Sequence, residues 1–143
     1  MISKEIYSKK IHGKGSLNFI LIHNAGGCHQ MFSYQMDTLL NHGNVILLDL
    51  PGHGLSPTAN NNTIDDSSAV IMGICRQYAL DNIYLIGLNN GANIAINTVY
   101  QNKFTFSGLI LIDPPLFMDN NVTNKLREFI TSIDADAYDG YIN

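Results

Sequence analysis

The sequence predicts one α/β domain built on a mostly parallel β-sheet with flanking helices. Short, continuously apolar runs of strand length alternate with longer segments in which apolar residues recur at helical spacing. Glycine, proline or asparagine follows most of the apolar runs, as expected at the ends of buried strands. The chain has 143 residues, 45% of them hydrophobic and 14% charged, which suits a single globular core.

The elements follow from these patterns in chain order. Loose alternation predicts an edge strand over 2–11. The four apolar runs predict buried parallel strands over 17–23, 45–50, 83–88 and 108–112. Helical spacing predicts helices over 31–40, 64–80, 92–100 and 122–133, the first of them stopped by Gly43.

Particular residues mark these helices. Thr63 or Asp65 is expected to cap the helix over 64–80, whose apolar face would carry Val70, Ile71, Ile74 and Tyr78. Met31, Tyr34 and Met36 are expected in the core. We interpret the chain as a single domain, 1–143, with its core at about 16–115 and the start of a cap-like helical segment at 118–143.

Composition excludes several classes of function. The net charge of -4 gives no electrostatic basis for binding nucleic acid or an anionic membrane. No apolar run reaches membrane-spanning length, and the first ten residues show no signal-peptide core. Cys28 and Cys75 lie far apart and form no metal-type spacing, so reduced thiols in the cytoplasm are expected. We expect no cofactor and no metal.

Three segments carry a recognisable chemistry, each beginning at the end of a predicted strand. The first is His23-Asn24-Ala25-Gly26-Gly27. The second is Asp49-Leu50-Pro51-Gly52-His53-Gly54-Leu55-Ser56. The third is Gly87-Leu88-Asn89-Asn90-Gly91. Together they resemble the oxyanion loop, the D-x-P-G-x-G-x-S turn and the G-x-S-x-G nucleophile elbow of the α/β-hydrolase family, over residues 17–115.

The elbow pattern has a physical reason. A sharp strand-to-helix turn needs small residues two before and two after its central residue, and Gly87 and Gly91 meet that need. The resemblance implies that the N–H groups of Ala25 and Asn90 form an oxyanion hole, with Asn24 in the place of the family's glycine.

Two departures separate this sequence from the family pattern. Asn89 stands where the family has a nucleophile, and a carboxamide cannot form the usual acyl-enzyme. All five histidines, at 12, 23, 29, 42 and 53, precede Asn89, whereas the family places its catalytic histidine last. The family is also about twice this length, so the sequence is interpreted as the N-terminal portion of a truncated α/β-hydrolase fold.

Other residues near these motifs are weaker candidates. The resemblance gives His23 a structural role and makes Asp113, at the end of a strand, a weak candidate for the catalytic acid. His29 could face the cleft, and Asp49 reads as a turn former. Cys28 is expected to be a small buried thiol rather than a nucleophile.

The functional interpretation therefore keeps three hypotheses open. The favoured one is a homologue whose ancestral activity is hydrolysis of small carboxylic esters or acyl substrates, inactive or impaired as this chain. The second is an active hydrolase completed by another chain or by deamidation of Asn89 to aspartate. The third is a binding module for a small carboxylate or acyl ligand. Turnover of a substrate separates the active hydrolase from the other two hypotheses. Ligand-induced thermal stabilisation then separates the binding module from an inert remnant.

The last predicted strand suggests an oligomer. Residues 108–112 are apolar, and nothing after them in the sequence is predicted to be a further strand. An exposed apolar sheet edge favours pairing between chains unless it is covered. The sequence thus predicts a homodimer or higher oligomer that forms through this edge, unless the helix over 122–133 covers it.

Overall fold

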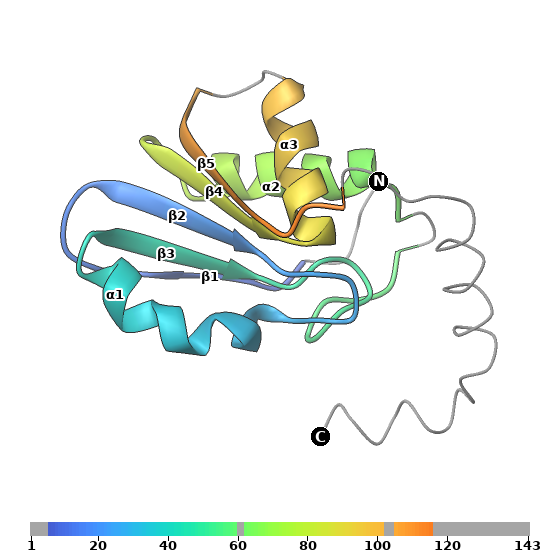
Figure 1. Cartoon of the computed structure of the whole chain (residues 1–143), viewed down its shortest axis with the longest axis horizontal. Coiled ribbons are helices and arrows are strands. Elements are labelled where there is room, and N and C mark those ends of the chain that lie inside the picture. Colours follow the sequence, from blue (N-terminus) through green and yellow to red (C-terminus); the bar gives the residue numbers. More distant parts are fainter. Residues whose placement is uncertain (1–5, 60–61, 102–104, 116–143) are drawn as a thin grey trace.

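The computed structural model describes residues 6–59, 62–101 and 105–115 of the chain. Its strands are β1 (Ser8–Ile11), β2 (Leu17–Ile22), β3 (Gly43–Leu48), β4 (Ile83–Leu88) and β5 (Phe106–Ile112). Its helices are the 3-10 helix η1 (His29–Gln35) and the α-helices α1 (Met36–Leu40), α2 (Ile64–Gln77) and α3 (Asn90–Tyr100). The strands form one sheet in the order β1-β3-β2-β4-β5 (Figure 1).

The sheet is parallel except at one edge. β3 pairs in parallel with β2, β2 with β4, and β4 with β5, whereas β1 pairs antiparallel with β3. The predicted fold class and the edge strand near the N-terminus are confirmed. The predicted strand over 2–11 is longer than β1, and its first residues lie outside the described part.

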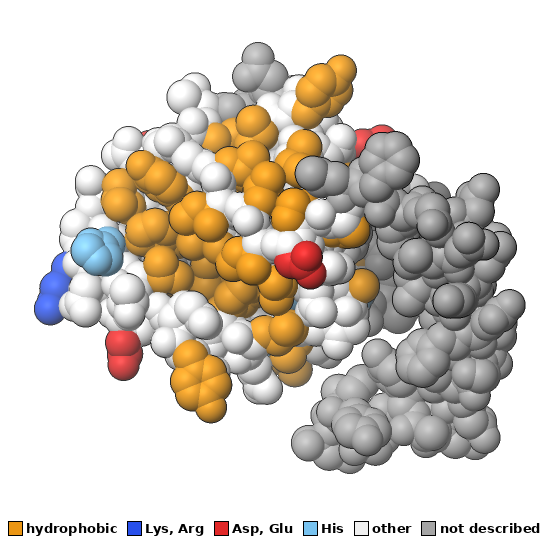
Figure 2. Space-filling view, viewed as in Figure 1, with side chains coloured by type: hydrophobic (Ala, Val, Ile, Leu, Met, Phe, Trp, Pro, Cys, Tyr) orange, Lys and Arg blue, Asp and Glu red, His pale blue; other side chains and the backbone are white. Residues whose placement is uncertain are grey.

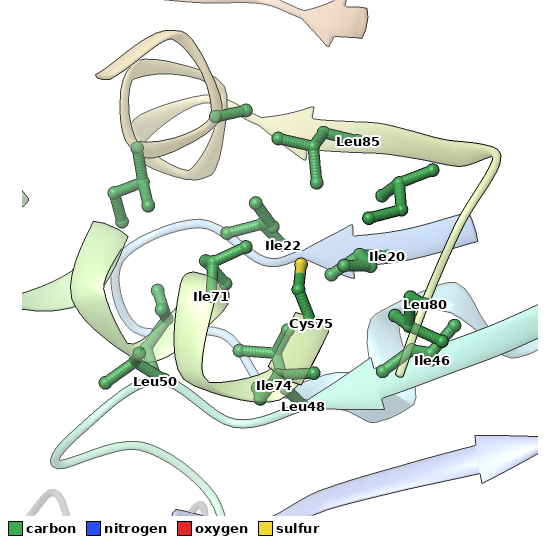
Figure 3. Packing of buried hydrophobic residues seen from close by; sticks show 14 residues of the cluster. Ile20, Ile22, Ile46, Leu48, Leu50, Ile71, Ile74, Cys75, Leu80 and Leu85 are labelled. Carbon is green, nitrogen blue, oxygen red and sulfur yellow. The ribbon is translucent and has the colours of Figure 1, made fainter. Parts of the chain in front are cut away.

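Helices cover both faces of this sheet. On one face α2 and α3 pack over a large cluster that includes Ile20, Leu48 and Leu85. On the other face η1 and α1 pack over a smaller cluster around Phe19, Leu21 and Phe32. Figure 3 shows Ile71, Ile74 and Cys75 of α2 pointing toward the strands. The predicted apolar face of this helix is therefore confirmed, with Tyr78 only partly buried.

The start of α2 follows local sequence signals. Thr63 is its N-cap: the Thr63 hydroxyl accepts a hydrogen bond from the Asp66 N–H, and the Asp66 carboxylate accepts one from the Thr63 N–H. This reciprocal pair is a capping box, and it fixes the first turn. The side-chain hydrogen bonds also hold the pKa of Asp66 below its usual value. Of the two predicted caps, Thr63 is correct.

The prediction of one helix over 31–40 is wrong. The segment is a 3-10 helix that passes into a five-residue α-helix. Met31 is 41% exposed and Tyr34 is 93% exposed, so neither is a core residue, whereas Phe32 is buried. One buried side chain in η1 is too little to stabilise a regular amphipathic helix. Met36 does pack against the smaller cluster.

Other boundaries also differ from the predictions: β2 ends at Ile22, β3 ends at Leu48 and β5 begins at Phe106. Gly43 is the first residue of β3 and does more than stop a helix. It lies so close to Leu17 of β2 that there is no room for a side chain at this position. α2 ends at Gln77, and α3 begins two residues earlier than expected, at Asn90. The helix over 122–133 and the segment 118–143 lie outside the described residues.

β5 is not the buried strand that its sequence predicts. Leu109, Ile110, Leu111 and Ile112 are 36–45% exposed. Register pairs Ile110 with Ile86 and Ile112 with Leu88, whose side chains lie on the η1 side of the sheet. Figure 2 shows hydrophobic side chains gathered over the strands on the face turned to the viewer. A candidate docking edge is therefore present within the part of the chain that the structure covers.

Within the described ranges, no helix is both long enough and apolar enough to cross a bilayer.

Candidate functional site

The three sequence motifs meet at one edge of the sheet. The first follows β2, the second follows β3 and the third begins at the end of β4, and these strands are parallel neighbours. The connection from β2 to β3 crosses one face, and those through α2 and α3 cross the other. Ligands of open α/β sheets bind at such a reversal, beyond the carboxyl ends of the strands. The topology therefore places the candidate site here.

The elbow between β4 and α3 has the sharp geometry that its glycines predict. Asn89 adopts φ 50° and ψ -116°, a combination rarely adopted by a residue with a side chain. A Cβ on Gly87 would collide with Gly91 and Ala92, and one on Gly91 would collide with the carbonyl groups of Ile22 and His23. Both glycines thus let the start of α3 approach the ends of β2 and β4.

The side chain of Asn89 is bonded to its own surroundings. Its Oδ1 accepts a hydrogen bond from the Asn90 N–H at 3.0 Å, and its Nδ2 donates to the Asp113 carbonyl at 3.4 Å. The Asn89 N–H donates to the Ile112 carbonyl at 2.8 Å. Asn89 therefore occupies one of the two N–H groups expected in an oxyanion hole, and its side-chain partners among the described residues are backbone groups.

Asp113 contacts the elbow through its backbone. It is exposed, has φ 48°, and offers its carbonyl rather than its carboxylate to Asn89. The described residues give its carboxylate no histidine partner. The structure places this predicted acid beside the elbow without placing it in a catalytic pair.

The loop after β2 presents the other expected donor. Ala25 is exposed, and its N–H makes no hydrogen bond within the described ranges. The Asn24 carbonyl accepts from the Gly27 N–H at 3.1 Å, which closes a tight turn. Asn24 Oδ1 is buried and lacks a hydrogen-bond partner among the residues that the structure covers. This loop is the part of the site with free polar groups.

His23 joins two strand ends and is fully buried. Its Nδ1 donates to the Asn24 carbonyl at 2.8 Å, and its Nε2 accepts from the Leu50 N–H at 2.9 Å. Because one ring nitrogen donates and the other accepts, the ring is neutral. Burial, the largest influence, lowers the pKa of His23 below 6.5. This geometry supports the structural role that the resemblance assigns to His23.

His29 lies against Asp49, which sequence reasoning treated only as a turn former. The His29 Nδ1 is 2.9 Å from each carboxylate oxygen of Asp49, and the His29 N–H donates to Oδ1 at 2.7 Å. The Leu55 N–H donates to Oδ2 at 2.9 Å. Burial by itself would raise the pKa of Asp49, but the hydrogen bonds from Leu55 and His29 outweigh it and lower the pKa.

The pairing of His29 with Asp49 was missed because the two residues are distant in sequence. A signal was present, since each follows one of two adjacent parallel strands. Cys28, beside His29, is partly exposed rather than buried as predicted.

A small cavity adjoins the elbow at Asn90, between the turn after β3 and the starts of α2 and α3. It has a volume of about 120 Å³, and its lining includes His53, Asn62, Thr63 and Asn90. These side chains come from the turn after β3, the start of α2 and the start of α3. Polar groups from three elements thus face one space large enough for a few heavy atoms.

Comparisons with known proteins identify the fold of this chain. The chain is 25% identical over 88% of its length to a dihydrolipoyllysine-residue acetyltransferase component of an acetoin cleaving system from Cupriavidus necator, covering 33% of that protein. It is 24% identical over 74% of its length to a 2-succinyl-6-hydroxy-2,4-cyclohexadiene-1-carboxylate synthase from Escherichia coli, covering 42% of it.

A solved esterase from Exiguobacterium antarcticum superposes with a TM-score of 0.80 at 21% identity, over 90% of this chain and 51% of that one. The chain thus spans less than half the length of these curated relatives and about half of that structure. The family model described as the alpha/beta hydrolase fold matches residues 18–143. The chain therefore belongs to the α/β-hydrolase fold family.

Proposed function

We propose that this chain derives from a hydrolase of small carboxylic esters or related acyl compounds and that, as this chain, it does not turn such substrates over. The observation that carries the proposal is the state of the elbow. Asn89 holds the position and backbone conformation of a nucleophile, yet its side chain is a carboxamide bonded to the Asn90 N–H. A carboxamide is a poor nucleophile, and no acyl-enzyme of the usual kind can form on it.

The same contact also weakens stabilisation of an oxyanion. A tetrahedral intermediate needs N–H donors that are aimed at its developing charge and free to bind it. The Asn90 N–H is one of the two expected donors, and Asn89 Oδ1 already accepts its hydrogen bond. A substrate oxygen would have to displace that amide oxygen. The loss of the nucleophile and the blocked donor act in the same direction.

The class of ligand follows from the fold and from relatives. Solved structures of similar fold include esterases, and the name of the Escherichia coli relative describes a product that carries a carboxylate. The cavity beside Asn90 is lined by neutral polar side chains, His53 and the apolar side chains of Leu50, Ile64 and Ile94, a mixture that suits a small acyl or carboxylate group. Because the chain covers only part of these relatives, their whole activities are not transferred to it.

The test is hydrolysis of a panel of short-chain nitrophenyl esters by the purified protein beside Asn89→Ala. We expect both proteins to match the rate in buffer. Asn89→Ala is a suitable partner because it removes the carboxamide and frees the Asn90 N–H while it leaves Gly87 and Gly91 in place. If the wild type hydrolyses esters and Asn89→Ala does not, position 89 performs chemistry and the proposal is wrong.

A second candidate function is binding without turnover, which the polar cavity favours. A small carboxylate or acyl compound that binds the folded protein raises its melting temperature, and the rise grows with the logarithm of ligand concentration once the ligand exceeds its Kd. We expect such stabilisation by short-chain carboxylates and its loss in Asn90→Leu, which fills the cavity with apolar atoms. Unchanged melting temperatures across the panel would leave an inert remnant of the family.

The remaining alternative is that deamidation or another chain completes an active enzyme. The Asn90 N–H lies against the Asn89 amide oxygen, so the backbone nitrogen that attacks the amide carbon during deamidation is close to it. Peptide mapping that places the mass increase on Asn89 would favour this alternative. An increase on Asn90, which precedes Gly91, would count against it. A cytoplasmic location also stays a prediction.

A further inference from the structure

The geometry points to a binding site for a transition-metal ion of the zinc type at Cys28, His29 and Asp49. No sequence pattern indicates such a site, because the two cysteines have no metal-type spacing. The fold joins the three residues from two segments: Cys28 and His29 lie at the start of η1, and Asp49 comes directly after β3. Their thiol, imidazole and carboxylate ligand atoms lie within 4.8 Å of one another.

The distances allow coordination after a small movement. With metal–ligand bonds of about 2.0–2.3 Å, tetrahedral ligand atoms lie about 3.5 Å apart, so a pair separated by 4.8 Å must close by little more than about 1 Å. Cys28 follows two glycines in a partly exposed loop, which can supply that movement. The His29 Nδ1 is 2.9 Å from Asp49 Oδ1, so these two atoms would move apart by about 0.6 Å to bind the same ion.

Asp49 is held in the way a metal ligand requires. Its side chain has no exposed surface, and backbone N–H groups of His29 and Leu55 each donate to one of its oxygens. A Cβ at Gly54 would collide with this carboxylate, so the glycine provides its space. A metal ion would replace only the contact from the His29 ring, and both backbone hydrogen bonds would remain to orient the carboxylate.

The donor set indicates which ion fits. Sulfur, nitrogen and oxygen together suit Zn²⁺ or Co²⁺, whereas Mg²⁺ and Ca²⁺ prefer oxygen alone. The Tyr7 ring lies 4.7 Å from the His29 ring, centre to centre, and shields one side of the imidazole. Three protein ligands leave a fourth position of a tetrahedral ion for water or a small anion. The site is distinct from the Asn89 elbow and does not depend on the proposed function.

Cobalt is the probe of choice, because a thiolate bound to Co²⁺ gives a strong near-ultraviolet charge-transfer band and tetrahedral Co²⁺ gives intense visible bands. The untagged protein is reduced, freed of metal by chelation and titrated with Co²⁺, followed by competition with Zn²⁺. We expect one equivalent to bind with both sets of bands, and Zn²⁺ to remove them and raise the melting temperature.

Two cysteine variants provide the matched comparison. Cys28→Ser should abolish the charge-transfer band and weaken binding at least tenfold, because it removes the sulfur ligand. Cys75→Ser should retain the band, because Cys75 is buried between α2 and the sheet and burial raises the pKa of its thiol to about 11. His29→Ala should weaken metal binding. It should leave β3 folded, because His29 takes no part in the pairing of β3 with β2.

The proposal is overturned by any of three results. These are no charge-transfer band in the wild type, an equal band in Cys28→Ser, or a band lost only in Cys75→Ser. Circular dichroism of each variant shows whether the protein is folded, so a lost band in an unfolded variant is not counted. If Cys28→Ser does not fold, carboxamidomethylation of the native Cys28 thiol supplies the same test.

Discussion

Strain at the elbow leads to a prediction about glycine and alanine at position 89. Asn89 has φ 50° and ψ -116°, and residues held in such sparsely populated regions cost about 1–3 kcal/mol each. Glycine has no Cβ and adopts this region without that strain. Asn89→Gly should therefore be more stable than Asn89→Ala. Both changes remove the same carboxamide, so the loss of its hydrogen bonds cancels between them.

Position 89 is also a helix N-cap, and this needs a control. Glycine is better than alanine at an ordinary N-cap, by about 0.5–1 kcal/mol. Thr63 is the N-cap of α2 and has φ -82°, where alanine meets no strain. The stability gap between the glycine and alanine variants at 89 should exceed the gap at 63 by about 1–3 kcal/mol. The extra chain entropy of unfolded glycine is common to both positions.

The assay is urea unfolding of the four variants, followed by far-ultraviolet circular dichroism. Equal dependence on urea concentration shows that only stability has changed. We expect the free energy of unfolding to fall most in Asn89→Ala. If the gaps at 89 and 63 agree within experimental error, the elbow is not strained in solution. The inference that this turn keeps the geometry of a nucleophile elbow would then be wrong.

Three further predictions concern the histidine, a glycine and the sheet edge. Because burial lowers the pKa of His23, the unfolded chain takes up a proton that the folded state excludes. The contribution of His23 to stability is therefore complete above pH 6.5 and is lost as the pH falls below it. His23→Gln should flatten this part of the profile of stability against pH, and an unchanged profile would contradict the assignment. Gly91→Ala should destabilise by more than about 2 kcal/mol in thermal unfolding, because its Cβ meets two carbonyl groups, whereas Gly73→Ala, whose Cβ meets nothing within 4 Å, should not. Light scattering should show an oligomer of the wild type and a smaller mass for Ile110→Lys on exposed β5; a monomeric wild type at micromolar concentration would remove the idea.

Local signals account for the parts of the fold that sequence reasoning predicted well. The strand over 83–88 matches β4 to the residue, and Thr63 caps α2 as expected. Apolar runs and capping residues act over a few positions, so they can be read without knowing the rest of the structure. The prediction failed for 31–40, where helical spacing was present but the sheet offered a contact for only one side chain of η1.

The candidate site divides in a similar way. Its position was predictable, because each motif follows a strand and parallel strands end at the same edge. The bond from the Asn90 N–H to Asn89 and the pairing of His29 with Asp49 were not predictable from residue patterns. Each depends on where a side chain turns after the backbone has folded.

The sequence by itself determined the fold class, the mostly parallel sheet and the absence of a nucleophilic side chain from the elbow, since these depend on residue type and periodic pattern. Only the tertiary structure decided that the Asn89 side chain accepts the hydrogen bond of the Asn90 N–H and that β5 is exposed. The same holds for the meeting of Cys28, His29 and Asp49. The reason is physical: adjacency of strands brings together residues twenty or more positions apart, and hydrogen bonds at such meeting points follow from distances that no local pattern encodes.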